Sequence, residues 1–388
     1  MKQIMPSTPF FILSIFLLAL SACSSGSGSD SSGTGTVAVA SNGGVNGGLT
    51  GDIWFFRGVE NRAETLRFNM ETGEVSTFNA VGWASPSIDG AHYINYVFRF
   101  EEVGFCTLRE RHYNHLIQVR DTRTSELLAS FKTVNDLGID KKLSPDATRM
   151  LLLERPPVSD CGSDANSPFD YAVYSANGEK LTTLPRNYLA VNWLPDNRLV
   201  ALQLVEGFTV QLWVSDSPHS VNMLPFGGPF SLDESTLGYA IQSVGSLHAN
   251  LTGSHLMIHL TTDRSTVGPF FRHGNVIVVD LNNPTLWELF TSNENDQSIR
   301  ATDAALSPDG ETILASYDWT GAGVLLPSGI GFTLAQSGGS VVTLPLNTIK
   351  TPLPPADETS PMRTVVTSTN AQVSINSSVA MYWTPTVR

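Results

Sequence analysis

One pattern of apolar and polar positions recurs along the chain. It is clearest in LSPDGETILAS, residues 306–316, where a polar Ser-Pro-Asp-Gly turn follows an apolar residue and precedes a short apolar run. Pro308 presets the first corner of a type I turn, and Gly310 can adopt the left-handed conformation that closes a bulged hairpin. The stretch is therefore predicted to form two antiparallel strands joined by a tight turn.

Similar turn-plus-strand units occur five more times, at residues 87–97, 143–153, 193–202, 250–258 and 374–382. The spacing of about 50 to 67 residues is close to that of a repeat architecture. A second set of hairpins lies between these units, at 117–131, 171–184, 210–224, 276–290 and, in a looser form, 324–344. Each repeat is therefore predicted to supply two hairpins, or four strands.

The two ends of the repeat region are half-units. It begins with an outer-type hairpin at 51–79 and ends with an inner-type hairpin at 368–385. In a ring, these two halves would complete one blade. The predicted fold is therefore an all-β, six-bladed β-propeller of four-stranded blades over residues 51–388, closed by pairing of the N-terminal and C-terminal hairpins. A β-sandwich is the alternative, but it does not account for the six-fold recurrence.

The repeat also resembles a known type. An apolar residue with Ser-Pro-Asp-Gly, a short strand, an apolar strand ending in Asp, a short turn and a Leu-containing strand resemble the WD-like repeats of TolB-type propellers. The best copies are 306–316 with 276–291, and 143–153 with 171–184. The resemblance spans residues 51–388 and implies a blade type, not an activity. It extends to the blades alone, because the sequence shows no α/β domain like the one that precedes the blades of TolB.

The N-terminal residues are expected to lie outside the fold. Residues 1–22 have the pattern of a signal peptide, with an apolar stretch too short to span a bilayer, and they end in Leu20-Ser21-Ala22-Cys23. That ending resembles the bacterial lipobox, which implies a lipid on Cys23. Ser24 follows, and by analogy this implies an outer-membrane lipoprotein that faces the periplasm or the exterior. The alternative is an ordinary signal peptide with an incidental cysteine.

Residues 23–50 comprise this cysteine and a Gly/Ser-rich stretch, which is predicted to be a flexible tether with a reach of roughly 30 Å. Composition agrees with a fold of many short strands, because only 15% of the 388 residues are charged and Gly and Pro are plentiful. The net charge of −13, with no basic stripe, argues against a nucleic-acid partner.

The two remaining cysteines are predicted to form a disulfide. Cys106 lies in an insertion at 100–116, and Cys161 lies in the equivalent insertion, 155–170, of the next repeat. Equivalent loops of adjacent blades emerge side by side, and an envelope compartment is oxidising. Closing a loop of about 56 residues would stabilise the fold by roughly 4 kcal/mol on the chain-entropy model. Two unpaired thiols are the alternative.

A search for chemistry finds no Gly-x-Ser-x-Gly, His-Glu-x-x-His, Cys-x-x-Cys or P-loop motif. His112-x-x-His115 lacks a clear third ligand, and the Asp-rich second insertion only partly matches a calcium loop, so neither a metal nor a cofactor is expected. The candidates for partner contact are instead polar and aromatic residues of the two insertions, together with Trp319: Arg109, Arg111, His112, Tyr113, His115, Asp160, Asp164 and Trp319.

The remaining long insertions, 225–245, 261–274, 292–300 and a Pro-rich stretch from 351, are predicted to share one face with the first two. Variable loops on a rigid scaffold are where binding usually occurs. The predicted function is therefore a monomeric, lipid-anchored envelope propeller that binds or scaffolds a protein partner through this loop-rich face. The alternative is an enzyme, a hydrolase or lyase on glycans, with its site in the central channel. Asp309 is read as a turn residue on the opposite, short-loop face.

Overall fold

The structure is a computed structural model of the chain, which divides into two compact units, Met1–Thr36 and Val37–Arg388. All described residues belong to the second unit. They are 50–59, 62–72, 75–78, 83–97, 100–103, 110–113, 115–156, 168–206, 209–231, 241–262, 274–284, 287–291, 299–319, 330–331, 340–345, 363–366, 374–375 and 382–387. The predicted signal peptide, lipidated Cys23 and tether lie outside this set, apart from Thr50.

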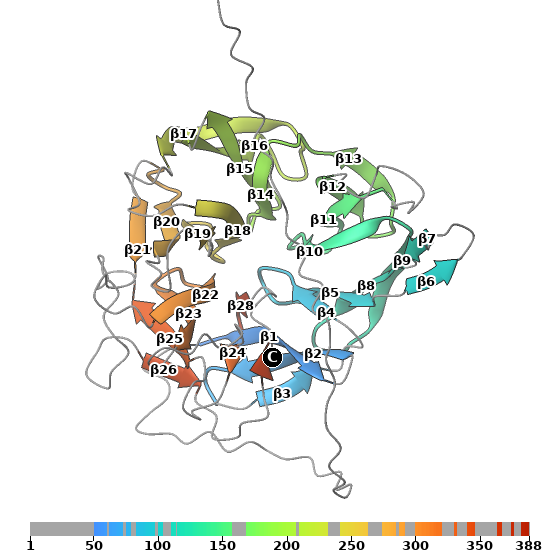
Figure 1. Cartoon of the computed structure of the whole chain (residues 1–388), viewed down its shortest axis with the longest axis horizontal. Helices are drawn as coiled ribbons and strands as arrows, with labels where there is room; N and C mark the ends of the chain where they lie inside the picture. The colour runs from blue at the N-terminus through green and yellow to red at the C-terminus, as the bar shows by residue number, and fades with distance from the viewer. Residues whose placement is uncertain are drawn as a thin grey trace, which may run out of the picture. The chain divides into compact units, whose positions relative to one another are not determined.

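Five antiparallel four-stranded sheets, here called blades 1 to 5, stand in a ring in chain order (Figure 1). Blade 1 consists of β4 (Trp83–Pro86), β5 (His92–Val97), β8 (His115–Asp121) and β9 (Leu127–Thr133). Blade 2 consists of β10 (Asp136–Leu143), β11 (Arg149–Arg155), β12 (Asp170–Ser175) and β13 (Lys180–Thr183). Blade 3 consists of β14 (Tyr188–Trp193), β15 (Leu199–Glu206), β16 (Thr209–Ser215) and β17 (Met223–Ser231).

Blade 4 consists of β18 (Ile241–Ala249), β19 (His255–Thr262), β20 (Gly274–Asp280) and β21 (Trp287–Thr291). Blade 5 consists of β22 (Ile299–Leu306), β23 (Thr312–Trp319), β25 (Ser340–Pro345) and β26 (Arg363–Val366). In each blade the first strand in the sequence is the innermost (Figure 1). The all-β propeller predicted from the repeats is confirmed, and five of the predicted turn-plus-strand units are the inner hairpins of these blades.

A further sheet, here called the closing sheet, joins the two ends of the repeat region. It contains β1 (Asp52–Val59), β2 (Arg62–Asn69), β3 (Val75–Phe78), β24 (Ile330–Gly331), β27 (Ser374–Ile375) and β28 (Tyr382–Thr384). β28 pairs antiparallel with β1, so that Asp52 lies opposite Thr384. The indole Nε1 of Trp54 donates to Thr384 Oγ1 at 2.9 Å. The predicted pairing of the N-terminal and C-terminal strands is confirmed.

The composition of this sheet corrects the predicted division into two hairpins. The N-terminal residues supply three strands, β1 to β3, and the C-terminal residues do not form an inner hairpin along them. Instead β27, opposite Arg57, and β28, opposite residues 52–54, lie in succession on the same edge of β1. A strand edge holds one row of partners, so these two short strands follow one another along it, and β24 pairs with the far edge of β27.

Two other predictions also need correction. The looser hairpin predicted at 324–344 is not formed as such, because β25 pairs with β23 and with β26, while residues 324–326 lie outside the described part of the chain. The insertion at 100–116 also contains strands that the sequence analysis did not predict. β6 (Phe100–Val103) and β7 (Glu110–Tyr113) pair in a small separate sheet.

The five turns between first and second strands share one conformation. The fourth residue of each has a positive φ, with values of 70° at Gly90, 58° at Ala147, 64° at Asn197, 68° at Gly253 and 81° at Gly310. The N–H of that residue donates to the carbonyl three positions earlier in every copy. In the last copy, the Asp309 carboxylate accepts from the hydroxyl of Ser307 at 2.5 Å and from the N–H of Glu311 at 3.0 Å. The predicted role of Asp309 in the turn is confirmed.

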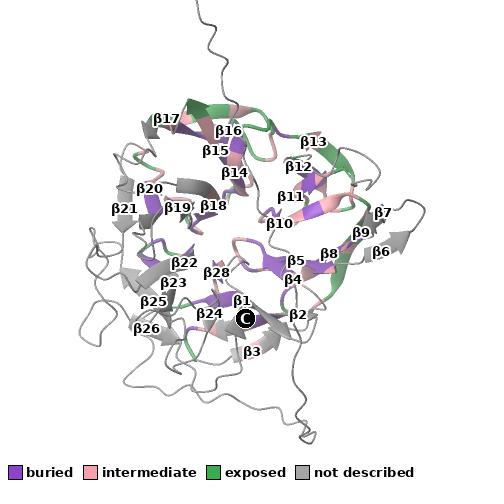
Figure 2. Ribbon diagram, in the orientation of Figure 1, coloured by how far each residue is buried: buried purple, intermediate pink, exposed green. Residues whose placement is uncertain are grey.

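Apolar side chains fill the spaces between blades. A cluster of buried residues packs between blades 3 and 4, another between blades 1 and 2, and a third between blades 2 and 3. Figure 2 shows buried residues on the inner and middle strands and exposed residues along the outermost strands β9, β13 and β17. Burial therefore stabilises the contacts between blades and leaves the outer edges open to solvent. Among the described residues, no helix has the length and hydropathy needed to cross a bilayer.

Candidate functional site

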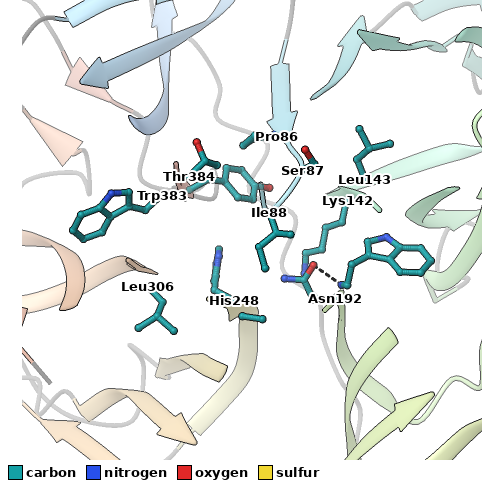
Figure 3. Close-up of a pocket in the computed structure, with 13 residues that line it drawn as sticks. Pro86, Ser87, Ile88, Lys142, Leu143, Asn192, His248, Leu306, Trp383 and Thr384 are labelled. Atoms are coloured by element: carbon teal, nitrogen blue, oxygen red, sulfur yellow. Dashed lines mark hydrogen bonds between the residues drawn. The ribbon is translucent and has the colours of Figure 1, made fainter. Parts of the chain in front are cut away.

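The ends of the inner strands meet at a cavity of about 40 Å³ at one mouth of the central channel (Figure 3). We call it the channel-mouth cavity. All five blades and the closing sheet contribute to its wall, through Pro86 on β4, Leu143 on β10, Trp193 on β14, Ala249 on β18, Leu306 on β22 and Thr384 on β28. These residues precede or lie beside the short first-to-second strand turns. The cavity is therefore on the short-turn face, opposite to the face on which function was expected.

Lys142 places a positive charge in the wall. Side chains alternate along β10, so Lys141 and Lys142 point to opposite faces of the strand. The ammonium of Lys142 is buried and donates to the carbonyl oxygen of Val191 on β14 at 2.7 Å. This hydrogen bond spans from blade 2 to blade 3 and holds the lysine at the cavity.

His248 faces the cavity from β18. Its ring makes an edge-on contact with the ring of Tyr382, with centroids 5.8 Å apart. Burial, and then the charge of Lys142, lower the pKa of His248 to about 3. Burial also lowers the pKa of His259, on the neighbouring strand β19, to about 4. Both imidazoles are therefore neutral at pH 7, and Lys142 is the cation of the described cavity wall.

Asn192 and Trp193 complete the polar part of the wall. The amide nitrogen of Asn192 donates to Leu247 O at 2.6 Å, and its oxygen accepts from the backbone N–H of Trp193 at 2.8 Å (Figure 3). Trp193 is 1% exposed. Its indole Nε1 has no hydrogen-bond partner among the residues that the structure describes. An indole N–H is a donor only, so this buried group needs an acceptor.

The described wall does not match the chemistry of glycan cleavage. Glycoside hydrolysis typically uses two carboxyl groups on either side of the scissile bond. The described lining of the cavity contains a lysine and a histidine but no carboxylate. Nor does the described part of the chain bring together three His, Cys, Asp or Glu residues as a metal site would. What the wall offers is hydrogen-bond donors and one positive charge.

The predicted partner-binding residues do not appear in the described lining of this cavity. Arg111, His112 and Tyr113 lie in β7, and Trp319 is the last residue of β23. The remaining predicted residues Arg109, Asp160 and Asp164, and the predicted disulfide between Cys106 and Cys161, lie outside the described part of the chain.

The expectation for His115 needs correction. Its side chain is fully buried, and Nδ1 lies 2.9 Å from the hydroxyl of Tyr96. Burial, followed by the charge of Lys141, lowers its pKa to about 4. His115 begins β8 rather than ending a loop, so its ring packs in the interface between blades 1 and 2 instead of meeting a partner.

Sequence reasoning missed the cavity, although the repeats carry a signal for it. The position two residues before each turn holds Ser85, Lys142, Asn192, His248 and Ala305 in the five blades, and four of these side chains are polar. The next position is apolar in every blade. Because Lys142, Asn192 and His248 all line the cavity, this polar position within an apolar inner strand is the feature that could have identified the site.

The similarities of this chain to known proteins are similarities of fold. No protein-family model and no curated protein sequence matches the chain. Among solved structures, TolB from Acinetobacter baumannii is similar with a TM-score of 0.48 and 12% identity, over 87% of this chain and 67% of that one.

Two further structures are similar at comparable levels. A protein assigned as TolB from Agrobacterium tumefaciens has a TM-score of 0.45 and 10% identity, over 88% of this chain and 100% of its own. A protein assigned as a 6-phosphogluconolactonase from Bacteroides uniformis has a TM-score of 0.41 and 16% identity, over 77% and 80%. At these identities the likeness is one of β-propeller fold alone.

Proposed function

We propose that this chain is a lipid-anchored protein of the cell envelope whose propeller, with the closing sheet as its sixth blade, binds a protein partner and does not act as an enzyme. The lipobox-like Leu20-Ser21-Ala22-Cys23 and the Gly/Ser-rich stretch after it support the anchor. The chemistry of the channel-mouth cavity supports binding over catalysis, because its described wall lacks the carboxyl pair that cleavage of a glycan would need.

The observation that carries the partner proposal is a set of exposed leucines on the outermost strands of three successive blades. Leu127 and Leu128 on β9, Leu181 on β13 and Leu224 on β17 are each between 41% and 50% exposed. Exposed apolar side chains on successive blades offer a protein partner apolar contacts. Two of these strands belong to blades 1 and 2, whose insertions contain the predicted partner-contact residues. We therefore place the partner against blades 1 to 3.

Crosslinking in intact envelopes, followed by purification of the full lipidated chain, tests this proposal. A double variant, Leu127→Ser with Leu128→Ser, is expected to lose a crosslinked protein that the wild-type chain retains, because the apolar contact on β9 is removed. Val205→Ser is the matched control, since Val205 is also exposed but lies near the end of β15, which is not an outermost strand. The partner proposal fails if the double variant and the control recover the same proteins, or if the purified wild-type chain degrades envelope glycans.

A further inference from the structure

The chain contains an apolar segment of its own that fits the proposed partner site. We propose that residues 37–40, Val-Ala-Val-Ala, dock on Leu127 and Leu128 of β9 and compete there with the protein partner. This regulation belongs to the partner site of the proposed function and rests on it. The 37–40 segment lies outside the described part of the chain, whereas the surface that receives it is described.

A β-bulge places both leucines on the same face of blade 1. Arg120 on β8 lies opposite Leu127 and Val119 lies opposite Ala129, so that Leu128 is an additional residue in β9. Ala129 packs against the cluster between blades 1 and 2. Since side chains alternate, Leu128 points to the other face, and the bulge directs Leu127 there too. Leu127 is 45% exposed on this face and Leu128 is 48% exposed.

That face of blade 1 is turned toward the closing sheet. Residues directly opposite each other in a sheet share a face, so Leu127 points to the same side as Arg120 and as Tyr93, the neighbour of Arg120 on β5. Tyr93 packs against Trp54 of β1, with ring centroids 6.3 Å apart. The two leucines therefore lie on the side of blade 1 that adjoins the first strand of the propeller.

The chain also enters the propeller on the short-turn face of the ring, where β9 begins. The carbonyl oxygen of Thr50 accepts from the indole Nε1 of Trp383 at 3.0 Å. A Cβ added to Gly90, in the first turn of blade 1, would lie 2.8 Å from the hydroxyl of Thr384. The N–H of Thr122, in the turn before β9, donates at 2.9 Å to the carbonyl oxygen of the residue that follows Gly90. A row of contacts thus leads from the entry point to the start of β9.

The length of chain before Thr50 fits the span to the two leucines. β9 is three strand positions outward from β4, a distance of about 14 Å at about 4.8 Å per position. Residues 41–49, rich in Gly and Asn, connect the 37–40 segment to Thr50, and a linker of this length has a typical reach of about 15–18 Å. A linker whose reach matches the span gives the docked segment its highest effective concentration.

The 37–40 segment differs from the rest of the Gly/Ser-rich stretch. It is a run of four apolar residues, whereas the other apolar residues after residue 23 in this stretch stand singly. In an extended conformation Val37 and Val39 share one face, so two β-branched side chains can meet two leucines. A spacer needs reach rather than apolar side chains, so this pattern favours docking. The docked segment would cover both leucines, and the segment and the partner would therefore exclude each other at β9.

The test compares the methyl resonances of Leu127 and Leu128 in the full lipidated chain, labelled with ¹³C at leucine, between the wild type and Val37→Ser with Val39→Ser. Leu127→Ile and Leu128→Ile assign the resonances. The double serine variant is expected to shift both resonances, because the apolar cover is lost. Val45→Ser is the matched control, since it makes the same substitution in the same stretch and leaves the 37–40 segment intact. A synthetic peptide of residues 36–41, added to the double variant, should return the resonances toward their wild-type positions.

Competition is measured by the crosslinking in intact envelopes. Val37→Ser with Val39→Ser should recover at least about twofold more of the crosslinked partner than the wild type, because the competing segment is removed. Three results would overturn the proposal: unshifted leucine resonances in the double variant, an equal shift in Val45→Ser, or unchanged recovery of a partner that the wild type retains. Retention of the partner by Leu127→Ser with Leu128→Ser contradicts the proposed function instead. The methyl comparison needs no partner, so the two failures are distinguishable.

Discussion

The interfaces between blades 3 and 4 and between blades 1 and 2 are built in different ways. The buried cluster between blades 3 and 4 consists entirely of aliphatic residues, such as Leu202 and Leu256. The interface between blades 1 and 2 also has an apolar cluster, but polar groups run through it. The ammonium of Lys141 lies 3.9 Å from the ring centroid of Tyr96, whose hydroxyl contacts His115. Nearby, the hydroxyl of Tyr174 donates to Glu154 Oε2 at 2.6 Å.

One ring therefore combines two kinds of stabilisation. The free energy gained by aliphatic packing is proportional to the apolar area that is buried, and it does not depend on pH. Buried polar groups are directional, and each depends on the protonation and position of its partner. We therefore expect the first interface to be sensitive to lost volume, and the second to be sensitive to acid and to single lost hydrogen bonds.

The largest effect is expected from truncation in the aliphatic interface. Leu256→Ala should lower the free energy of unfolding by about 2–5 kcal/mol, because it removes buried methyl groups and leaves a cavity. Chemical denaturation measures this loss. Leu224→Ala is the control, since Leu224 is 50% exposed and its truncation should change stability by less than about 0.5 kcal/mol. Equal losses in the two variants would remove the distinction between core and edge.

Acid should weaken the polar interface. The pKa of His115 is about 4 in the fold, below the value of about 6.5 expected in the unfolded chain. The unfolded chain therefore binds more protons between these values, and stability that is complete above pH 6.5 is lost as the pH falls toward 4. His115 accounts for about 3 kcal/mol of this loss in the free energy of unfolding, since each unit of pKa difference corresponds to 1.36 kcal/mol.

His115→Gln should reduce this loss, as measured by denaturation at pH 7 and pH 4.5. Some acid sensitivity should remain, because His248 and His259, on the face of blade 4 away from the aliphatic cluster, also have lowered pKa values. A wild-type protein with the same stability at both pH values would contradict the prediction. A His115→Gln variant as acid-sensitive as the wild type would assign the effect to the other two histidines.

A single hydroxyl in the same interface should have a measurable effect. Tyr174→Phe removes the donor that Glu154 accepts from, and an under-satisfied buried carboxylate costs about 1–3 kcal/mol. Glu154 keeps its contacts with Asn135 and Lys180, which limits the loss to this range. Tyr188→Phe is the control. Burial raises the pKa of Tyr188, as it does that of Tyr174, but no hydrogen bond to a carboxylate contributes at Tyr188. Comparison of the two variants by thermal unfolding isolates the hydrogen bond.

The smallest effect, and one of opposite sign, is expected at the turn beside this interface. Ala147 has a positive φ of 58°, a conformation that costs an alanine about 1 kcal/mol. Glycine occupies the equivalent position in three other blades, at Gly90, Gly253 and Gly310. Ala147→Gly should therefore stabilise the protein by up to about 1 kcal/mol, and Gly310→Ala should destabilise it. A loss of stability in Ala147→Gly would show that the methyl group packs more favourably than the strain costs.

Much of the fold could be predicted because its signals are local. The turn around Pro308 and Gly310 needs only neighbouring residues to form, and it repeats with regular spacing. The make-up of the closing sheet could not be predicted, because the choice of β27 and β28 as successive partners of β1 depends on contacts more than 300 residues apart.

The candidate site shows the same division. His112 and His115 were read together as parts of one loop, although a strand begins at His115 and buries its ring. Lys142 and His248 lie more than 100 residues apart in the sequence, in strands of different repeats. Their meeting at one cavity follows from the ring, which places equivalent positions of separate repeats side by side.

The pairing of β1 with β28 has a consequence for the order of events in synthesis. The first strand of the propeller, at Asp52–Val59, hydrogen-bonds with a strand that ends at Thr384, so the ribosome must complete more than 320 further residues before that strand has its partner. Until then β1 has an unpaired edge, which other strands can bind. The ring can therefore close only after residues 382–384 have been made, because β28 is the strand that pairs with β1.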